Sequence, residues 1–280
     1  KINLPQKLEG DKRSSSLKSF EIRTFITLKN GKDSIAVKHV INNAIMDHRI
    51  RVKWSTNVDD LTYNYADQGF CLLKRQSANP YEETWREQGF VEKPMPIYPL
   101  ENMIVLSDNE SHFSLHTGMM KEYQVETDTK ELAVTLFRSN GMLGRDNLAW
   151  RPGRASGINN MIVETPDGQM IQEMVFEYSV QFGREAYETK QLYRISEELA
   201  THQDFYQQQS LNSYLHRIDR FPIPLVEQVI QSEFSLFELE STNLFTSMCR
   251  DNGRGGTLLR IFNPTNNSQD LNRFDSEYIH

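Results

Sequence analysis

Short apolar runs alternate with turn-forming clusters along most of this chain, and this alternation constrains the fold more than any other feature. The runs are rich in valine, isoleucine, leucine and phenylalanine and are too short for typical helices. The clusters between them contain asparagine, aspartate, glycine or proline, which favour turns. Many short strands with turns between them indicate a mainly β fold, a large antiparallel β-sandwich. We place strands at residues 21–28, 34–41, 49–54, 69–73, 102–106, 112–115, 130–137, 161–163, 174–180 and 257–262.

The strongest hairpin signal lies near the start of the chain. Asn30-Gly31 separates the strand-like runs at residues 21–28 and 34–41. Both central residues of a type I′ turn need positive φ, which asparagine and glycine tolerate best. The sequence therefore predicts a type I′ hairpin here.

The run at residues 49–54 shows the clearest two-residue period. Ile50, Val52 and Trp54 alternate with three basic residues. In a strand, alternate side chains point to opposite faces of the sheet. The run therefore predicts a half-buried antiparallel strand with Trp54 facing inward.

One segment has a helical composition. Residues 184–214 are rich in glutamate, glutamine, leucine and alanine and contain no glycine or proline, whereas Pro222 and Pro224 follow soon after. We predict one helix, or two with a break near residues 201–203. A β chain of this length often forms one large domain. We expect a large β-sandwich domain at residues 1–220, including this helical insertion, and a C-terminal β segment at residues 221–280 packing on it.

The composition excludes several classes of partner. The net charge of −7 argues against a nucleic-acid partner. No apolar run approaches the roughly 18 residues that cross a bilayer, so we predict no membrane partner. Two cysteines far apart, Cys71 and Cys249, make no disulfide framework and favour a cytoplasmic location. Because residue 1 is a lysine, we expect a processed or trimmed chain.

The histidines do not predict a metal site. His112 and His116 are four residues apart and would share one face of a helix. The residues between them are typical of a strand, in which the two side chains would lie roughly 13 Å apart. We expect His39 and His48 to form hydrogen bonds within or between strands.

No catalytic centre is evident either. Adjacent carboxylates at residues 59–60, 82–83 and 197–198 are typical of solvated surface, because paired catalytic carboxylates usually come from different segments. GxSxG, GxGxxG, HExxH and phosphate-binding loop motifs are absent from the sequence. We predict no catalytic residue, no metal and no cofactor in this chain.

Residues 136–156 are the strongest candidate for a functional segment. The segment holds three glycines and Pro152 as well as four arginines, namely Arg138, Arg145, Arg151 and Arg154. Arginine suits planar, two-pronged recognition of carboxylates and other polar groups. Glycine and proline hold such a loop in a defined shape, and shaped loops on β scaffolds often meet a ligand or another domain. The alternative is a solvated loop with surface ion pairs.

Several segments in order resemble one enzyme family. They are LP (4–5), DKRS (11–14), VINN (40–43), DHRIRV (47–52), GMMKEY (118–123), LFRS (136–139), GMLGRD (141–146), RPG (151–153), FEY (176–178) and LRIFNP (259–264). Together they resemble the C-terminal β-sandwich region of bacterial family 38 glycoside hydrolases, the retaining α-mannosidases. The residues MMK at 119–121 depart from the family's usual Leu-Pro neighbourhood.

The resemblance implies a galactose-mutarotase-like super-sandwich that is part of a larger enzyme. In this family the zinc ion and the aspartate nucleophile belong to an N-terminal catalytic domain, which is absent here, as are the strands before Leu4. The implied function is the accessory portion of a zinc-dependent α-mannosidase, inactive alone. Its implied partners are its own catalytic domain and an α-mannoside, and a homo-oligomer is left open.

The resemblance also implies roles for the arginine-rich segment at the rim of the active site. Arg145 and Arg151 would hydrogen-bond sugar hydroxyls or brace carboxylates of the catalytic domain, with Arg154 in the same segment. Asp146 would orient one arginine. Trp150 would either stack on a sugar face or pack at an interface.

Two other functions stay open at this point. A free-standing carbohydrate-binding β-sandwich would need exposed aromatic side chains on one face, with Trp54, Trp85 and Trp150 as candidates. A purely structural interaction module would show a large apolar docking patch. The sequence does not determine which α-mannosidic linkage or aglycone a parent enzyme would cleave.

Overall fold

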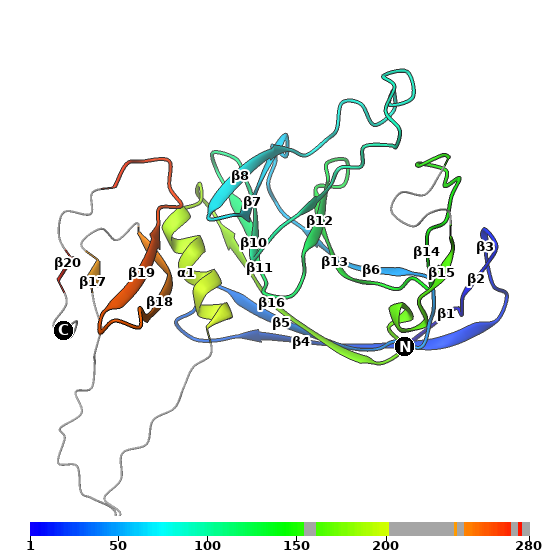
Figure 1. Cartoon of the computed structure of the whole chain (residues 1–280), viewed down its shortest axis with the longest axis horizontal. Helices are drawn as coiled ribbons and strands as arrows, with labels where there is room; N and C mark the ends of the chain where they lie inside the picture. Colours follow the sequence, from blue (N-terminus) through cyan, green and yellow to red (C-terminus); the bar gives the residue numbers. More distant parts are fainter. Residues whose placement is uncertain (154–160, 202–237, 240–243, 270–273, 276–280) are drawn as a thin grey trace, which may run out of the picture. The chain divides into compact units, whose positions relative to one another are not determined.

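The protein is described here by a computed structural model covering residues 1–153, 161–201, 238–239, 244–269 and 274–275. Two compact units divide the chain, Lys1–Ala200 and Thr201–His280. The described residues are mainly β with one α-helix, which confirms the predicted fold class (Figure 1). The domain boundary predicted near residue 220 lies outside the described residues and stays a prediction.

The first unit is built on an eight-stranded antiparallel sheet. The hairpin predicted near the start of the chain forms its β4–β5 pair, and β16 pairs with β5 on the other side. In spatial order the strands are β1 (Ile2–Pro5), β4 (Leu17–Leu28), β5 (Ile35–Asn42), β16 (Glu173–Gly183), β11 (His112–His116), β10 (Met103–Ser107), β7 (Tyr63–Gln68) and β8 (Cys71–Gln76).

A second, four-stranded antiparallel sheet covers one face of the first. The strand predicted at residues 49–54 belongs to this sheet, and its apolar residues Ile50, Val52 and Trp54 pack against the core between the sheets, as the two-residue period predicts. Its opposite face carries charged side chains. The strands, in spatial order, are β6 (Arg49–Ser55), β13 (Glu131–Arg138), β12 (Glu122–Glu126) and β9 (Ile97–Pro99).

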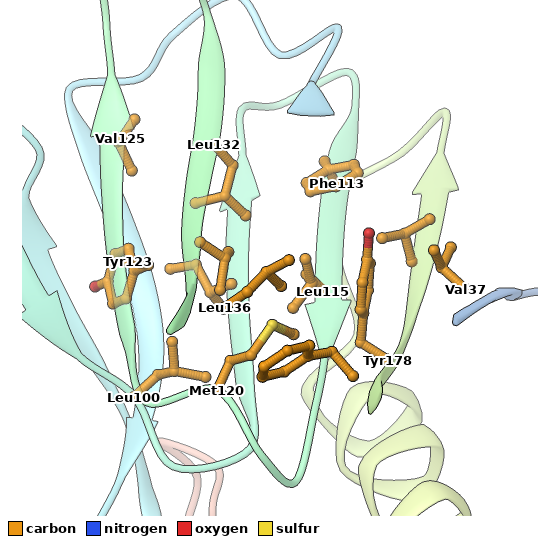
Figure 2. Packing of buried hydrophobic residues seen from close by; sticks show 14 of the residues in the cluster. Val37, Leu100, Phe113, Leu115, Met120, Tyr123, Val125, Leu132, Leu136 and Tyr178 are labelled. Atoms are coloured by element: carbon orange, nitrogen blue, oxygen red, sulfur yellow. The ribbon is translucent and has the colours of Figure 1, made fainter. Parts of the chain in front are cut away.

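The core between the two sheets is apolar. Figure 2 shows Leu132 of β13 and Val125 of β12 on one side, and Phe113 and Leu115 of β11 on the other. Leu132, Phe113 and Leu115 are completely buried. Burying each side chain of this size contributes about 1.5–3 kcal/mol, so this core fixes the frame that carries the surface loops.

A chain of polar contacts crosses this apolar core. The Trp54 Nε1–H donates to the Tyr178 hydroxyl oxygen at 3.2 Å, and that hydroxyl lies 3.0 Å from His39 Nε2. His39 Nδ1 lies 2.9 Å from Thr24 Oγ1 on the neighbouring strand. The hydrogen bonds predicted for His39 between strands are thereby confirmed.

The single described α-helix, α1 (Thr189–Ala200), packs on the outer face of the large sheet. Leu192, Tyr193 and Ser196 are its buried residues, and Ser196 Oγ lies 2.8 Å from His116 Nδ1 on β11. The helix lies within the segment predicted to be helical. The rest of that prediction, residues 202–214, falls outside the described residues.

Two short antiparallel strand pairs flank the end of the small sheet where β6 begins and β13 ends. One joins β2 (Leu8–Glu9) to β3 (Lys12–Arg13), and the other joins β14 (Met142–Leu143) to β15 (Val163–Glu164). A short 3-10 helix, η1 (Pro166–Gln169), follows β15. Figure 1 draws this end of the sandwich on the right, and it carries the candidate site.

The second unit contains two described pairs of antiparallel strands. β18 (Phe245–Asp251) pairs with β19 (Thr257–Phe262), which is the strand predicted at residues 257–262. β17 (Glu238–Leu239) pairs with β20 (Phe274–Asp275).

Two turn predictions are wrong in detail. At Asn30-Gly31 only the glycine has positive φ, 76°, so the turn is not type I′ and the connection from β4 to β5 is longer. Gly69 and Phe70, predicted to begin a strand, form the turn between β7 and β8 with φ of 61° and 70°. The apolar Phe70 resembles a strand residue in sequence, but the pairing of β7 with β8 places it at the turn.

Candidate functional site

The arginine loop, residues 144–153, has a defined backbone shape. Gly144, Asn147 and Gly153 have φ of 81°, 49° and 82°, a region that glycine and asparagine enter most easily. The Asn147 side-chain oxygen accepts a hydrogen bond from the Gly153 N–H at 3.1 Å, and the Gly153 carbonyl accepts one from the Asn147 N–H at 2.8 Å. These reciprocal bonds close the loop on itself.

Two of the predicted site residues contact each other within the loop. Arg151 Nη2 donates to the carbonyl oxygen of Arg145 at 2.8 Å. The Arg145 guanidinium is directed elsewhere, with Nη2 3.8 Å from Asp11 Oδ1 on the β2–β3 turn. Arg151 therefore fixes the backbone from which the Arg145 side chain extends.

The loop is also attached to the proline-rich segment, residues 79–99. The Lys93 backbone N–H donates to the Trp150 carbonyl at 2.7 Å, and Arg86 Nη2 donates to the Ala149 carbonyl at 3.2 Å. The Lys93 ammonium lies 5.7 Å from the centre of the Trp150 ring, within the range of a cation–π contact. Two loops far apart in sequence thus form one surface.

A pocket with a volume of about 620 Å³ opens beside the arginine loop. Four arginines line it, Arg13, Arg49, Arg138 and Arg145, and we refer to it as the basic pocket. These residues come from β3, the start of β6, the end of β13 and the arginine loop. The fold therefore gathers at one place arginines that are widely separated in the sequence.

Glu122 on β12 organises two of these arginines. Arg138 donates to both of its carboxylate oxygens, with Nη2 at 2.8 and 2.9 Å and Nε at 3.3 and 3.1 Å. Arg49 Nη1 lies 3.4 Å away and the Thr135 hydroxyl donates at 2.6 Å. Burial raises the pKa of Glu122, but the hydrogen bonds from Arg138 and Thr135 outweigh it and leave the pKa below its usual value. The Arg138 head group is thereby held in place.

His48 and Ser139 form one wall of the pocket and are hydrogen-bonded to each other. His48 Nδ1 lies 3.0 Å from Ser139 Oγ, and the His48 backbone N–H donates to the same hydroxyl oxygen at 3.0 Å. This contact between segments confirms the hydrogen bonding expected of His48. Burial lowers the pKa of His48 and, with the charge of Arg13, outweighs the hydrogen bond to the Met46 backbone and the charge of Asp47, which raise it, so the neutral ring is favoured.

The predicted site residues are distributed as follows. Arg145 lines the basic pocket, and Arg151 hydrogen-bonds the backbone carbonyl of Arg145. The Trp150 side chain is 57% exposed and lies beside Lys93. Asp146 is exposed on the loop. Arg154 lies outside the described residues. The roles proposed for these residues toward a substrate stay predictions.

Sequence reasoning missed other residues of this region. Arg13, Arg49, Arg86 and Lys93 contribute through contacts that span many positions of the chain. A single sequence carries no signal for such pairings. Arg13 and Arg49 do lie in two of the segments that resemble the glycoside hydrolase family, DKRS (11–14) and DHRIRV (47–52).

The described residues hold no group of three or more histidine, cysteine, aspartate or glutamate side chains that would bind a metal ion. His112 Nδ1 lies 2.8 Å from the Glu185 carbonyl, and His116 is buried between two serine hydroxyls. Both described cysteines are free thiols. Within the described part of the chain, no helix has the length and apolarity needed to cross a membrane.

Comparisons with known proteins identify relatives of this sandwich. No family model matches the chain. A protein of Halalkalibacterium halodurans named "Putative mannosylglycerate hydrolase" is 26% identical over 270 residues, 92% of this chain and 25% of that protein. The chain therefore spans about a quarter of the length of this curated relative.

Two solved structures are similar to this one. An α-mannosidase from Enterococcus faecalis V583 is 25% identical with a TM-score of 0.53, over 66% of this chain and 18% of that chain. A glycosyl hydrolase family 38 protein from Enterococcus faecalis, 21% identical with a TM-score of 0.54, shares the fold over 70% of this chain and 22% of its own.

The fold thus defines a large β-sandwich of the kind found as one part of long glycoside hydrolases. More specifically, the resemblance to the β-sandwich region of the family 38 glycoside hydrolases, predicted from the sequence, is confirmed.

Proposed function

We propose that this chain is the C-terminal accessory portion of a zinc-dependent retaining α-mannosidase, that it supports the catalytic domain, and that its arginine loop forms part of the active-site rim. The observation that carries this proposal is the shared sandwich. The chain matches less than a quarter of each long glycosidase chain with which it was aligned in structure. A glycosidase parent is thus supported, and its substrate is part of the proposal.

Zinc binding belongs to the rest of the parent in this proposal. The described residues do not fit a zinc ion, because they contain no group of three or more ligand side chains. We therefore assign no step of bond cleavage to them. The loop's contribution is to contact the substrate, or the catalytic domain, through Arg145 and the exposed ring of Trp150.

An open strand edge supports a covalently attached partner. β1 pairs only with residues 17–20 of β4, so among the described residues 21–28 have no neighbour on that side. Ile26 and Leu28 on this stretch are 67% and 74% exposed. Such apolar open edges pair readily with other chains, and proteins usually cover them. We propose that an earlier part of the parent covers this edge.

The alternative, a free-standing carbohydrate-binding module, has less support. Trp54 packs in the core and Trp85 is 5% exposed, whereas Trp150 is 57% exposed. The three tryptophans therefore form no common aromatic platform. The cytoplasmic location and a homo-oligomer stay predictions.

The first test compares this 280-residue chain with its full-length parent in the hydrolysis of an aryl α-mannoside with added zinc. Activity of the parent alone supports the accessory role. Activity of the chain by itself contradicts it. If neither is active although the parent is folded and binds zinc, the α-mannosidase assignment is wrong. Mannosylglycerate, from the name of the bacterial relative, is the second substrate for this assay.

A further inference from the structure

The basic pocket concentrates positive charge in a protein whose net charge is −7. Of the residues that line it, Asp47 is the one with a carboxylate, against four arginines. That carboxylate is already held by neutral partners, since it accepts hydrogen bonds from the Leu8 N–H at 3.2 Å and the Gln169 side-chain amide at 2.7 Å. Asp47 therefore does little to pair the arginines around it.

Carboxylates behind the pocket neutralise only part of the remaining charge. Glu122 is shared between Arg138 and Arg49. The pair of Arg145 with Asp11 is weak, because it is 3.8 Å long and the Asp11 side chain is 99% exposed to solvent. Within the described part of the chain, Arg13 has no carboxylate within 4.0 Å.

The excess charge also acts on the groups within the pocket. Burial lowers the pKa of Arg49, and the neighbouring charges of Arg51 and Arg138 lower it further. The charge of Arg13 acts in the same direction on the pKa of His48, again after burial. For both groups burial is the largest cause, and carboxylates act against the arginines, because Glu122 and Glu126 raise the pKa of Arg49 and Asp47 raises that of His48.

A neutral donor is also part of the lining. The Asn140 side-chain oxygen accepts from the Met142 N–H at 3.3 Å, and its amide nitrogen is a hydrogen-bond donor within the lining. The volume of about 620 Å³ is typical of pockets that bind small molecules. Guanidinium groups match carboxylate and phosphate oxygens in two-pronged geometry. From this arrangement we infer that the basic pocket binds a small oxyanionic ligand, one that carries a carboxylate or a phosphate group.

This inference does not depend on the proposed function and is tested by binding alone. The full chain is titrated calorimetrically at low ionic strength with D-glycerate, with inorganic phosphate, and with glycerol as the uncharged counterpart of glycerate. We expect saturable binding of at least one anion, weaker at high salt because exposed charges are screened, and no binding of glycerol. The two anions distinguish a carboxylate site from a phosphate site.

Variants locate the site. Arg13→Gln and Arg49→Gln are expected to weaken binding roughly 10- to 100-fold, as the loss of a charge-assisted hydrogen bond does. Arg51→Gln is the matched control, because Arg51 lies on the same face of β6 as Arg49 but outside the pocket. The two side chains are equally buried, with 25% exposed for Arg51 and 24% for Arg49, and Arg51 pairs with Glu126 at 3.2 Å.

Two outcomes overturn the inference. One is no saturable binding of either anion to the folded chain. The other is an anion affinity that is equally strong in the Arg13→Gln variant and in the Arg51→Gln control. Arg13 is exposed and outside the described ion pairs, so its replacement leaves folding intact and decides the question even where Arg49→Gln unfolds.

Discussion

Arg151 Nη2 lies 2.8 Å from the carbonyl oxygen of Arg145, across six residues of the arginine loop. The two arginines, both predicted to bind sugar hydroxyls or to brace carboxylates of the catalytic domain, therefore differ in role. Arg145 lines the basic pocket, whereas Arg151 uses one guanidinium nitrogen to hydrogen-bond the backbone carbonyl of Arg145. The proposed contact with the active site is thus a property of the whole loop.

In the parent enzyme, Arg145→Ala is expected to lower kcat/KM about 10- to 100-fold, because a charge-assisted hydrogen bond to substrate is lost. Arg151→Ala is expected to act largely through Arg145, so the double variant loses less than the product of the two single effects. Steady-state kinetics measure this. Arg250→Ala, an exposed arginine of β18, is the control. Near-normal kinetics for both single variants contradict the role of the loop.

Gly153→Ala tests whether the shape of the loop matters. Gly153 has φ of 82°, where a β-carbon costs roughly 1–2 kcal/mol, so the loop is expected to rearrange. Because the loop is on the surface, kcat/KM in the parent should fall while the melting temperature changes little. Gly118→Ala is the control, since Gly118 has no positive φ and open space around it. Equal activity of the two variants would show that the loop shape is irrelevant.

Tyr178→Phe tests the polar chain in the core. The Trp54 N–H and His39 Nε2 both lose their partner when the Tyr178 hydroxyl is removed, and both lie in the core region. Leaving buried polar groups unsatisfied costs about 1–3 kcal/mol. Urea unfolding should show this loss, whereas Tyr63→Phe, at a residue that is 39% exposed, should change stability little. Equal losses in the two variants would mean that the polar chain contributes nothing specific.

Elements set by residues close together in sequence were predicted better than features set by contacts between distant segments. The two-residue period around Val52 and the glycine-free stretch around Leu192 are local, so the strand and the helix were predictable. The turn at Phe70 depends on how β7 pairs with β8, and its apolar side chain misled the prediction. The basic pocket brings Arg13 beside Arg138 through pairings of distant segments, which no local pattern encodes. The loop was predictable as a candidate, and its surroundings were not.

Ile26→Lys tests whether another part of the parent covers β4. Ile26 is 67% exposed in this chain, so a lysine there should be tolerated if nothing covers it. If the open edge is buried in the parent, the uncompensated charge is expected to cost several kcal/mol and to lower the melting temperature. Thr27→Lys, which places the charge on the opposite face of the same strand, is the comparison. Unchanged stability of both variants in the parent contradicts the proposal that another part of the parent packs over this stretch of β4.

The pH dependence of stability tests the buried pair of His116 and Ser196. Burial, and then the charge of His112, lowers the pKa of His116 to about 3 in the folded protein, whereas an unfolded histidine titrates near 6.5. As the pH falls below 6.5 the unfolded chain takes up a proton that the folded one rejects, so stability falls toward acid.

Between pH 7 and pH 5 this one residue is expected to remove about 2 kcal/mol from the free energy of unfolding. His116→Gln lacks the titration and should lose correspondingly less stability over that range, although it is less stable at pH 7 because the packing around Ser196 is disturbed. His39 and His48, whose pKa values are also lowered by burial, titrate in both proteins and cancel in the comparison. Urea unfolding at the two pH values gives the difference, and equal pH dependence in the two proteins would show that His116 takes up a proton in the folded state over the same pH range as in the unfolded chain.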